Sequence, residues 1–332
     1  MQVDLRLLRQ AQALMEHGSF SRAANALAQS QPTLSRGIKD LEERVGLPLF
    51  TRERTGVRPT DFGLVFMQHA TDLLARAGDL EREVALVKGL RSGEVALGAG
   101  VYPADTMAAR CATRFTAAHP YVRLRVTVAP PAELARLLRA RTLDLVVAEA
   151  GALVKVDDLE VLESLEPLPA FIVTRAGHPL ATRKVVELAD VLDYPYAQVQ
   201  SLAPRVLQPM LASRRRPATS RAEPLLPFPS LECPTARFAL DVVAATDAFT
   251  FASLGMIRGE LERGTLVPVL QPPWLRAEWA IARLRKRTLS PSMAALVEIL
   301  GDAHRANLVE EARLRKHWLG KKSPVSRATR RR

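Results

Sequence analysis

The chain has 332 residues, of which 48% are hydrophobic and 25% charged, a balance typical of soluble globular proteins with two or three domains. No apolar run reaches the roughly 18 residues that a transmembrane helix needs, which argues against a membrane protein. The formal net charge is +12, but the acid-free segment 313–332 holds nine lysines and arginines, which leaves +3 for the rest. Net charge therefore predicts a basic tail and says little about the body of the protein.

The N-terminal residues do not resemble a signal peptide. Asp4, Arg6 and Arg9 interrupt their apolar pattern, so we expect a cytoplasmic protein. The two cysteines, Cys111 and Cys233, lack the spacing of a metal motif, and the six histidines are scattered. We therefore expect reduced thiols, with a redox switch as the alternative, and neither a bound metal nor a cofactor.

The segment 1–45 predicts three short helices. Apolar residues three and four positions apart predict a helix over 4–16, with Gly18 as its C-terminal stop. Phe20 is expected to form a hydrophobic staple and Ser21 to act as the N-cap, which predicts a second helix over 22–28. After a short turn, a third helix is expected over 31–45.

A basic hairpin and a long helix are expected next. Residues 47–60 contain turn-forming prolines and a glycine and carry Arg52, Arg54 and Arg58, which predicts a short wing. Residues 61–90 predict a helix of about 45 Å with one narrow apolar stripe near heptad spacing. The stripe comprises Phe62, Phe66, His69, Leu73, Leu80, Val84 and Val87. Such a stripe needs a partner helix, so we expect a coiled-coil homodimer.

The second and third helices, with the tight turn between them, form a helix-turn-helix. An α-helix fits the major groove of B-DNA, where its N-terminal side chains reach base edges, so double-stranded DNA is the expected partner. The candidate DNA-binding residues are Ser21, Gln31, Pro32, Thr33, Ser35, Arg36, Lys39, Arg52 and Arg54. Glutamine can pair with adenine and arginine with guanine or phosphate, and the wing arginines are expected at phosphate or minor groove. The alternative is that these are ordinary solvated surface residues.

Strands and helices alternate in the rest of the chain. Strands expected at 95–98, 123–128 and 143–148, with helices at 104–118 and 131–141, predict a parallel sheet with right-handed crossovers. A second unit of this kind is expected, with strands near 170–174, 196–199, 249–252 and 266–270 and helices near 184–191, 204–212, 235–245 and 255–263. One more strand at 279–284, an irregular loop over 214–230 and a final helix over 291–315 complete the prediction.

The N-terminal motif resembles a known family. The residues that carry the resemblance are the run from Gly18 to Ala24, Leu27, the run from Ser30 to Ser35, Ile38, Leu41, Glu42, Gly46, the run from Leu49 to Arg52, Thr60 and Gly63. They resemble LysR-type transcriptional regulators, and the match runs without a gap. The remaining element order is similar to the family layout of a linker helix and a two-lobed effector domain like type 2 periplasmic binding proteins.

The resemblance implies an α+β and α/β multidomain fold. We expect a winged helix-turn-helix at 1–60, a dimerising linker helix at 61–90, a first effector lobe at 91–165 plus 287–312, a second lobe at 166–286 and a flexible basic tail at 313–332. It further implies a sequence-specific transcription regulator that acts as a homodimer or homotetramer. A small molecule between the lobes would modulate DNA binding or activation.

The effector site is expected at the C-terminal ends of the strands, as in other open α/β sheets. The candidates are Val101, Tyr102, Pro103, Pro130, Pro131, Glu149, Gln198, Gln200, Ser201 and Thr246. Val101 and Tyr102 stand where relatives often offer hydroxyls to a carboxylate, the two prolines lack N–H donors, and Glu149 would repel an anion. We therefore expect an effector that is less anionic than a dicarboxylate, aromatic or amphipathic, or no ligand at all.

Two other classes of function remain to be considered. Gly98 and Gly100 follow a strand and suggest a dinucleotide-binding turn, but Pro103 stands at the third glycine of that motif, so a plain tight turn is expected. This argues against an enzyme with a nucleotide cofactor, and no catalytic residue is predicted. The helix-turn-helix segment at 1–60 argues against a stand-alone solute-binding protein.

Overall fold

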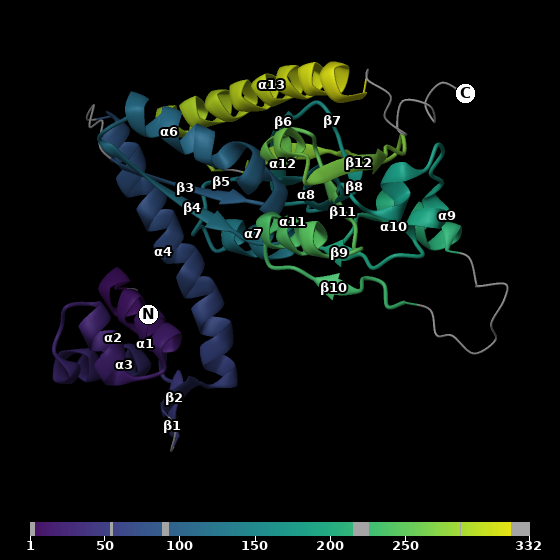
Figure 1. The fold of residues 1–332 in the computed structure, drawn as a ribbon. Helices are drawn as coiled ribbons and strands as arrows, with labels where there is room; N and C mark the ends of the chain where they lie inside the picture. The colour runs from purple at the N-terminus through teal and green to yellow at the C-terminus, as the bar shows by residue number, and fades with distance from the viewer. Residues whose placement is uncertain (1–3, 54–55, 88–92, 215–225, 286, 320–332) are drawn as a thin grey trace. The chain divides into compact units, whose positions relative to one another are not determined.

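The computed structural model describes residues 4–53, 56–87, 93–214, 226–285 and 287–319 (Figure 1). The chain divides into two compact units, Met1–Arg91 and Ser92–Arg332. In its described residues the first unit contains α1 (Leu5–His17), α2 (Phe20–Ala26), α3 (Gln31–Val45), β1 (Phe50–Glu53), β2 (Gly56–Pro59) and α4 (Asp61–Val87). The two antiparallel strands form the predicted wing.

Local capping explains where α3 begins and ends. The Ser30 hydroxyl accepts the amide of Thr33 at 3.3 Å, which satisfies a donor of the first turn. Gly46 adopts a left-handed φ of 81° and closes the last turn by donating to the Glu42 carbonyl. The predicted bounds of this helix, 31–45, are thus confirmed.

The predicted bounds of α2 are wrong at both ends. The helix begins at Phe20 with Ser19 as the flanking residue, so Ser21 lies inside the first turn and is not the N-cap. It ends at Ala26, because Ala28 adopts a left-handed φ of 52° through which a helix does not continue.

One face of α4 completes the core of the first unit. Met67 and Ala70 are buried with Leu14, Leu34 and Leu49 from the other elements. A neighbouring face of α4 leaves part of the predicted stripe exposed, namely Phe62, His69, Leu73 and Leu80, while Phe66 packs partly against the core. The side chains of Val84 and Val87 and residues 88–90 lie outside the described residues.

The first lobe of the second unit has three layers. Its sheet has the order β4-β3-β5-β14-β6 and consists of β3 (Gly93–Ala99), β4 (Val122–Val128), β5 (Leu145–Glu149), β6 (Leu159–Ser164) and β14 (Trp279–Leu284). One face packs against a helical segment made of α5 (Val101–Pro103), the π-helical turn η1 (Ala104–Ala108) and α6 (Ala109–Ala118). The other face packs against α7 (Pro131–Arg139) and α8 (Ala150–Leu153). The predicted parallel pairing of β3 with β4 and β5 is confirmed.

The position of β14 corrects the predicted lobe boundary. The sequence prediction placed 279–284 in the second lobe, whereas β14 lies between β5 and β6 and runs antiparallel to both. The chain therefore crosses between the lobes twice, once at β7 (Leu168–Pro169) and once at β13 (Arg276–Ala277). These two short strands pair with each other at the crossover.

The second lobe is smaller and its sheet is not the predicted parallel one. Its elements are β8 (Phe171–Arg175), η2 (Pro179–Thr182), α9 (Leu188–Val191), β9 (Ala197–Gln198), α10 (Pro204–Ser213), β10 (Leu231–Glu232), α11 (Ala236–Ala245), β11 (Thr250–Ala252), α12 (Arg258–Arg263) and β12 (Leu266–Leu270). Both β11 and β12 pair antiparallel with β8, whereas β9 pairs parallel with β10 and Tyr196 forms a parallel bridge with Phe249, so the predicted parallel arrangement is present only in part. The helix predicted at 184–191 is reduced to the single turn of α9, and residues 215–225 of the predicted loop lie outside the described residues.

The last helix, α13 (Pro291–Leu319), packs on both lobes (Figure 1, yellow). Leu296 and Leu300 belong to the first-lobe core, while Leu314 belongs to a second-lobe core. The carboxylate of Glu311 accepts the amides of Leu254 and Gly255, both at 3.0 Å, and burial raises its pKa. Because α13 continues to Leu319, residues 313–319 of the predicted tail are helical, and 320–332 lie outside the described residues. No helix in the described chain is long and apolar enough to cross a membrane.

A buried ion pair fixes β3 and β5 to the chain beyond β14. Asp144 pairs with Arg287, and the two side chains are only 8% and 3% exposed. Asp144 also accepts the Ala96 amide at 2.6 Å, and Arg287 donates to the Leu143 carbonyl at 2.7 Å. A buried pair of this kind is costly to break, because one partner stays in a low-dielectric environment.

We expect Asp144→Ala to destabilise the second unit by about 3–5 kcal/mol. Urea unfolding followed by tryptophan fluorescence measures this, because Trp274, Trp279 and Trp318, the chain's three tryptophans, all lie in that unit. Glu133→Ala is the matched control, since it removes an exposed pair with Arg136 and should leave the midpoint almost unchanged. Equal midpoints for Asp144→Ala and the wild type would contradict the role of the pair.

Candidate functional site

The N-terminal half of α3 presents most of the predicted DNA-binding side chains to solvent. Leu34, Ile38 and Leu41 point into the core, and this spacing turns the intervening residues outward. The exposed residues are Gln31, Pro32, Thr33, Arg36 and Lys39, while Ser35 is half-buried. Ser21 is exposed on α2 and Arg52 on β1, and Arg54 lies outside the described residues.

The recognition helix is seated on α1 by a contact that the sequence prediction missed. A Cβ at Gly37 would lie 1.9 Å from Oε1 of Gln10, so a larger residue there would have to displace the buried Gln10 side chain. Gln10 is buried and donates from Nε2 to Oε1 of Gln29 in the turn, at 2.7 Å. A glycine inside a helical pattern was the available sequence signal.

A single carboxylate connects α3 to the wing. Oε1 of Glu42 accepts the amides of Leu49 and Phe50 at 2.7 and 3.0 Å, where the chain enters β1. The guanidinium of Arg52 lies 5.1 Å from the centre of the Phe20 ring, a cation–π contact that holds the wing near α2. The Arg52 side chain is exposed to solvent, so its charge is accessible on the same unit as the exposed α3 residues.

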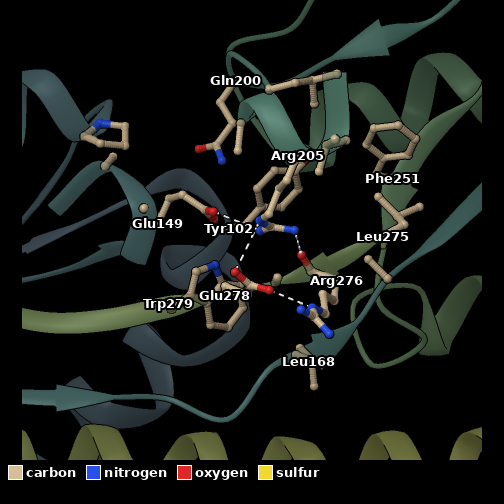
Figure 2. Close-up of a pocket in the computed structure, with 18 of the residues that line it drawn as sticks. Tyr102, Glu149, Leu168, Gln200, Arg205, Phe251, Leu275, Arg276, Glu278 and Trp279 are labelled. Carbon is tan, nitrogen blue, oxygen red and sulfur yellow. Dashed lines mark hydrogen bonds and ion pairs between the residues drawn. The ribbon is translucent and has the colours of Figure 1, made fainter. Parts of the chain in front are cut away.

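A pocket of about 610 Å³ lies between the two lobes of the second unit (Figure 2). Five predicted effector residues line it, namely Tyr102, Pro131, Glu149, Gln200 and Ser201. The other five, Val101, Pro103, Pro130, Gln198 and Thr246, are not among the lining residues.

Helix geometry explains why neighbours in sequence separate here. Val101, Tyr102 and Pro103 form α5, where successive side chains point about 100° apart, so only the middle one lines the pocket. Thr246 is engaged elsewhere: its hydroxyl donates to the Val242 carbonyl at 2.8 Å at the end of α11.

Arg205 is the central polar group of the pocket, and the sequence prediction missed it. Figure 2 shows its guanidinium between the carboxylates of Glu149 and Glu278. Nη2 lies 2.9 Å from Oε1 of Glu149, and Nε lies 3.3 Å from Oε2 of Glu278. Nη1 donates to the carbonyl oxygens of Arg276 (2.9 Å) and Trp274 (3.4 Å). Arg205 on α10 therefore ties the second lobe to Glu149 of the first lobe and to the crossover segment.

The remaining wall of the pocket is mainly apolar. Tyr102 and Trp279 come from the first lobe, Leu168 from the crossover, and Phe251 and Leu275 from the second lobe (Figure 2). Burial raises the pKa of the Tyr102 hydroxyl, so it stays protonated. Burial also raises the pKa of Glu149, and the hydrogen bond from Arg205 opposes that shift. The pocket is thus an apolar chamber whose two carboxylates are neutralised by arginines of the protein itself.

These two sites together define a class of protein. A winged helix-turn-helix with an exposed polar helix face is suited to duplex DNA, and an interlobe pocket on a separate unit is suited to a small molecule. The combination is that of a ligand-responsive DNA-binding regulator.

Comparison with known proteins agrees with this class. Residues 5–64 match the model of bacterial regulatory helix-turn-helix proteins of the lysR family, and residues 88–305 match the LysR substrate binding domain. The SDS degradation transcriptional activation protein of Pseudomonas sp. is 34% identical over 304 residues, 90% of this chain and 96% of the relative. The regulator GbpR of Azospirillum brasilense is 30% identical over 295 residues, 87% and 83% of the two chains.

Solved structures show the same fold. Full-length OxyR from Pseudomonas aeruginosa matches with a TM-score of 0.64 at 20% identity, covering 92% of this chain and 95% of its own. ArgP from Mycobacterium tuberculosis matches with a TM-score of 0.61 at 21% identity, covering 91% and 98%. The chain therefore belongs to the LysR family. It is a DNA-binding transcription regulator with an effector-binding domain.

The Arg205 bridge makes a pH-dependent prediction. Arg205→Met keeps much of the side-chain bulk but removes the cation that opposes the raised pKa of Glu149, so that pKa rises further. An acid with a raised folded-state pKa favours the folded protein at low pH, and this contribution is lost as the pH rises through that pKa. We expect Arg205→Met to lower the free energy of unfolding by roughly 1–3 kcal/mol near neutral pH, which is the cost of breaking a buried pair reduced by partial exposure. This loss of stability should diminish as the pH is lowered toward about 5.

Thermal unfolding of the full chain across this pH range is the measurement. The double variant Arg205→Met with Glu149→Gln is the control, because it removes the titrating group and should flatten the added pH dependence. A single variant with the wild-type stability and pH profile would show that the bridge does not hold the lobes together.

Proposed function

We propose that the chain regulates transcription as a cytoplasmic homodimer, assembled further into a tetramer, and that it has no catalytic role. The support for the dimer is α4, which leaves Phe62, Val65, Leu73 and Leu80 exposed along one side. A second copy of α4 would cover this stripe as a coiled coil and bring two α3 helices to half-sites about one helical turn apart, or a multiple of it.

The face of α3 carries the DNA-reading proposal. Exposed Gln31, Thr33 and Arg36, with half-buried Ser35, lie at the N-terminal end of a helix that contacts Gln10 of α1 at Gly37 and the start of the wing at Glu42. Side chains at this end are the ones that reach base edges in the major groove. Arg52 on the wing is suited to phosphate.

We expect Arg36→Ala and Ser35→Ala each to weaken binding to the operator by about tenfold or more, because each removes a groove contact. A gel-shift titration with the DNA upstream of the chain's own coding region measures this. Arg44→Ala is the matched control, since Arg44 lies at the other end of α3 and pairs with Asp40 at 2.8 Å. Undiminished binding by both α3 variants would mean that another surface reads the DNA.

For the effector, we propose an apolar or amphipathic molecule in the interlobe pocket. The supporting observation is the apolar wall around an Arg205 whose partners are two carboxylates and two carbonyls. A dicarboxylate would meet Glu149 and Glu278 and displace these bonds at a cost. The relative at 34% identity is named for SDS degradation, and SDS is itself an amphiphile with a long alkyl chain.

Titration calorimetry separates these classes of ligand. We expect decanoate to bind and succinate not to bind at equal concentration, because only decanoate buries apolar surface against the wall. Ala152→Trp, which places a large ring at a half-buried lining position, should weaken decanoate binding, whereas Ala140→Trp at the half-buried C-cap of α7, outside the pocket lining, should not. Tight binding of succinate in this pocket would contradict the proposal.

A further inference from the structure

The charges that line the interlobe pocket do not cancel. The cationic side chains are Lys155, Arg205 and Arg276, and the carboxylates are Glu149 and Glu278. Arg205 pairs with both carboxylates, and Arg276 pairs with Glu278 at 2.6 Å. Lys155 forms no ion pair with any described residue, so one positive charge in the lining has no acidic partner.

Arg205 is poorly suited to receive an anionic ligand, although it lies at the centre of the pocket. Its Nε, Nη1 and Nη2 atoms all donate to protein oxygens already. An anion at Arg205 would approach Glu149 and Glu278 and would have to break the bridge between the lobes. The negative charge of the ligand and those of the two carboxylates would repel one another strongly in a partly buried site.

Lys155 has the opposite properties. It is exposed on the turn after α8, and its lysine stem can lie along apolar surface while the ammonium stays hydrated. A single available cation beside an apolar wall matches a ligand that has one negative charge and a hydrocarbon body. A second negative charge would find no further unpaired cation among the described lining residues.

Resting on the proposed function, we propose that Lys155 binds the head group of the effector, which is a monoanionic amphiphile: an alkyl chain with one carboxylate or one sulfate. The chain of the ligand packs against Leu168, Phe251 and Trp279, and the head remains near the mouth of the pocket. Arg205 is then a brace between the lobes and not the receptor of the anion.

The test uses the full-length chain and three unbranched probes with ten carbon atoms each: decanoate, 1-decanol and decylamine. We expect the wild type to bind decanoate more tightly than 1-decanol. In Lys155→Met, decanoate affinity should fall about five- to tenfold, as for one charge-assisted contact, while 1-decanol affinity stays unchanged. Lys184→Met is the matched control, because Lys184 is an exposed lysine outside the pocket lining. Decyl sulfate replaces decanoate in a second titration, which compares a sulfate with a carboxylate head group. Its affinity should depend on Lys155 in the same way.

Any one of five results would overturn the assignment. Equal affinities for decanoate and 1-decanol in the wild type would remove the anionic head but leave the apolar pocket of the proposed function intact. A preference for decanoate that persists in Lys155→Met would place the head at another cation, and tighter binding of decylamine would assign it to the carboxylates. If no probe binds, or if Ala152→Trp changes nothing, the amphipathic effector itself is wrong.

Discussion

The ion pairs and hydrogen bonds of the Arg205 guanidinium are the interactions on which the second unit, here called the sensor unit, depends. It joins Glu149 at the end of β5, Glu278 after β13 and the carbonyl of Arg276, and so connects both lobes at the pocket. Because the protein neutralises its own carboxylates, the remaining wall can be apolar without stranding a buried charge. The geometry of the lobes and the shape of the pocket are therefore set by the same bonds, and a ligand that fits one arrangement better shifts the equilibrium toward it.

The DNA-binding unit follows a different physical rule, in which short-range contacts decide the geometry. Glu42 fixes the wing to α3, Gly37 leaves room for the Gln10 side chain of α1, and Ser30 and Gly46 set the ends of the helix. All of these contacts lie within the first unit, so the exposed face of α3 that is proposed to read DNA is held without a contribution from the sensor unit. Communication between the two units then requires only that their arrangement within an oligomer changes, not that the helix-turn-helix itself deforms.

The sequence predicted what depends on neighbouring residues and failed where distant segments meet. The bounds of α3 and the strands β3, β4 and β5 could be predicted because caps and periodicity are local, whereas the strand β6 at 159–164 was not predicted. Arg205 was missed because its partners, Glu149 and Glu278, lie far from it along the chain and belong to other elements. The strand at 279–284 was recognised but assigned to the wrong lobe, since nothing in its own pattern shows that the chain returns to pair with β5. For the effector residues, strand ends indicated the correct region, but not which side of α5 faces the pocket.

The link between the pocket and the DNA-reading helices is tested most directly by a DNase I footprint of the full-length chain on the DNA upstream of its own gene, with and without saturating decanoate. We predict two protected half-sites separated by a whole number of helical turns, and a change in the extent or spacing of protection when the ligand is present. The same change should be absent in Ala152→Trp, whose pocket is filled. A wild-type footprint that is identical with and without the ligand would contradict this link.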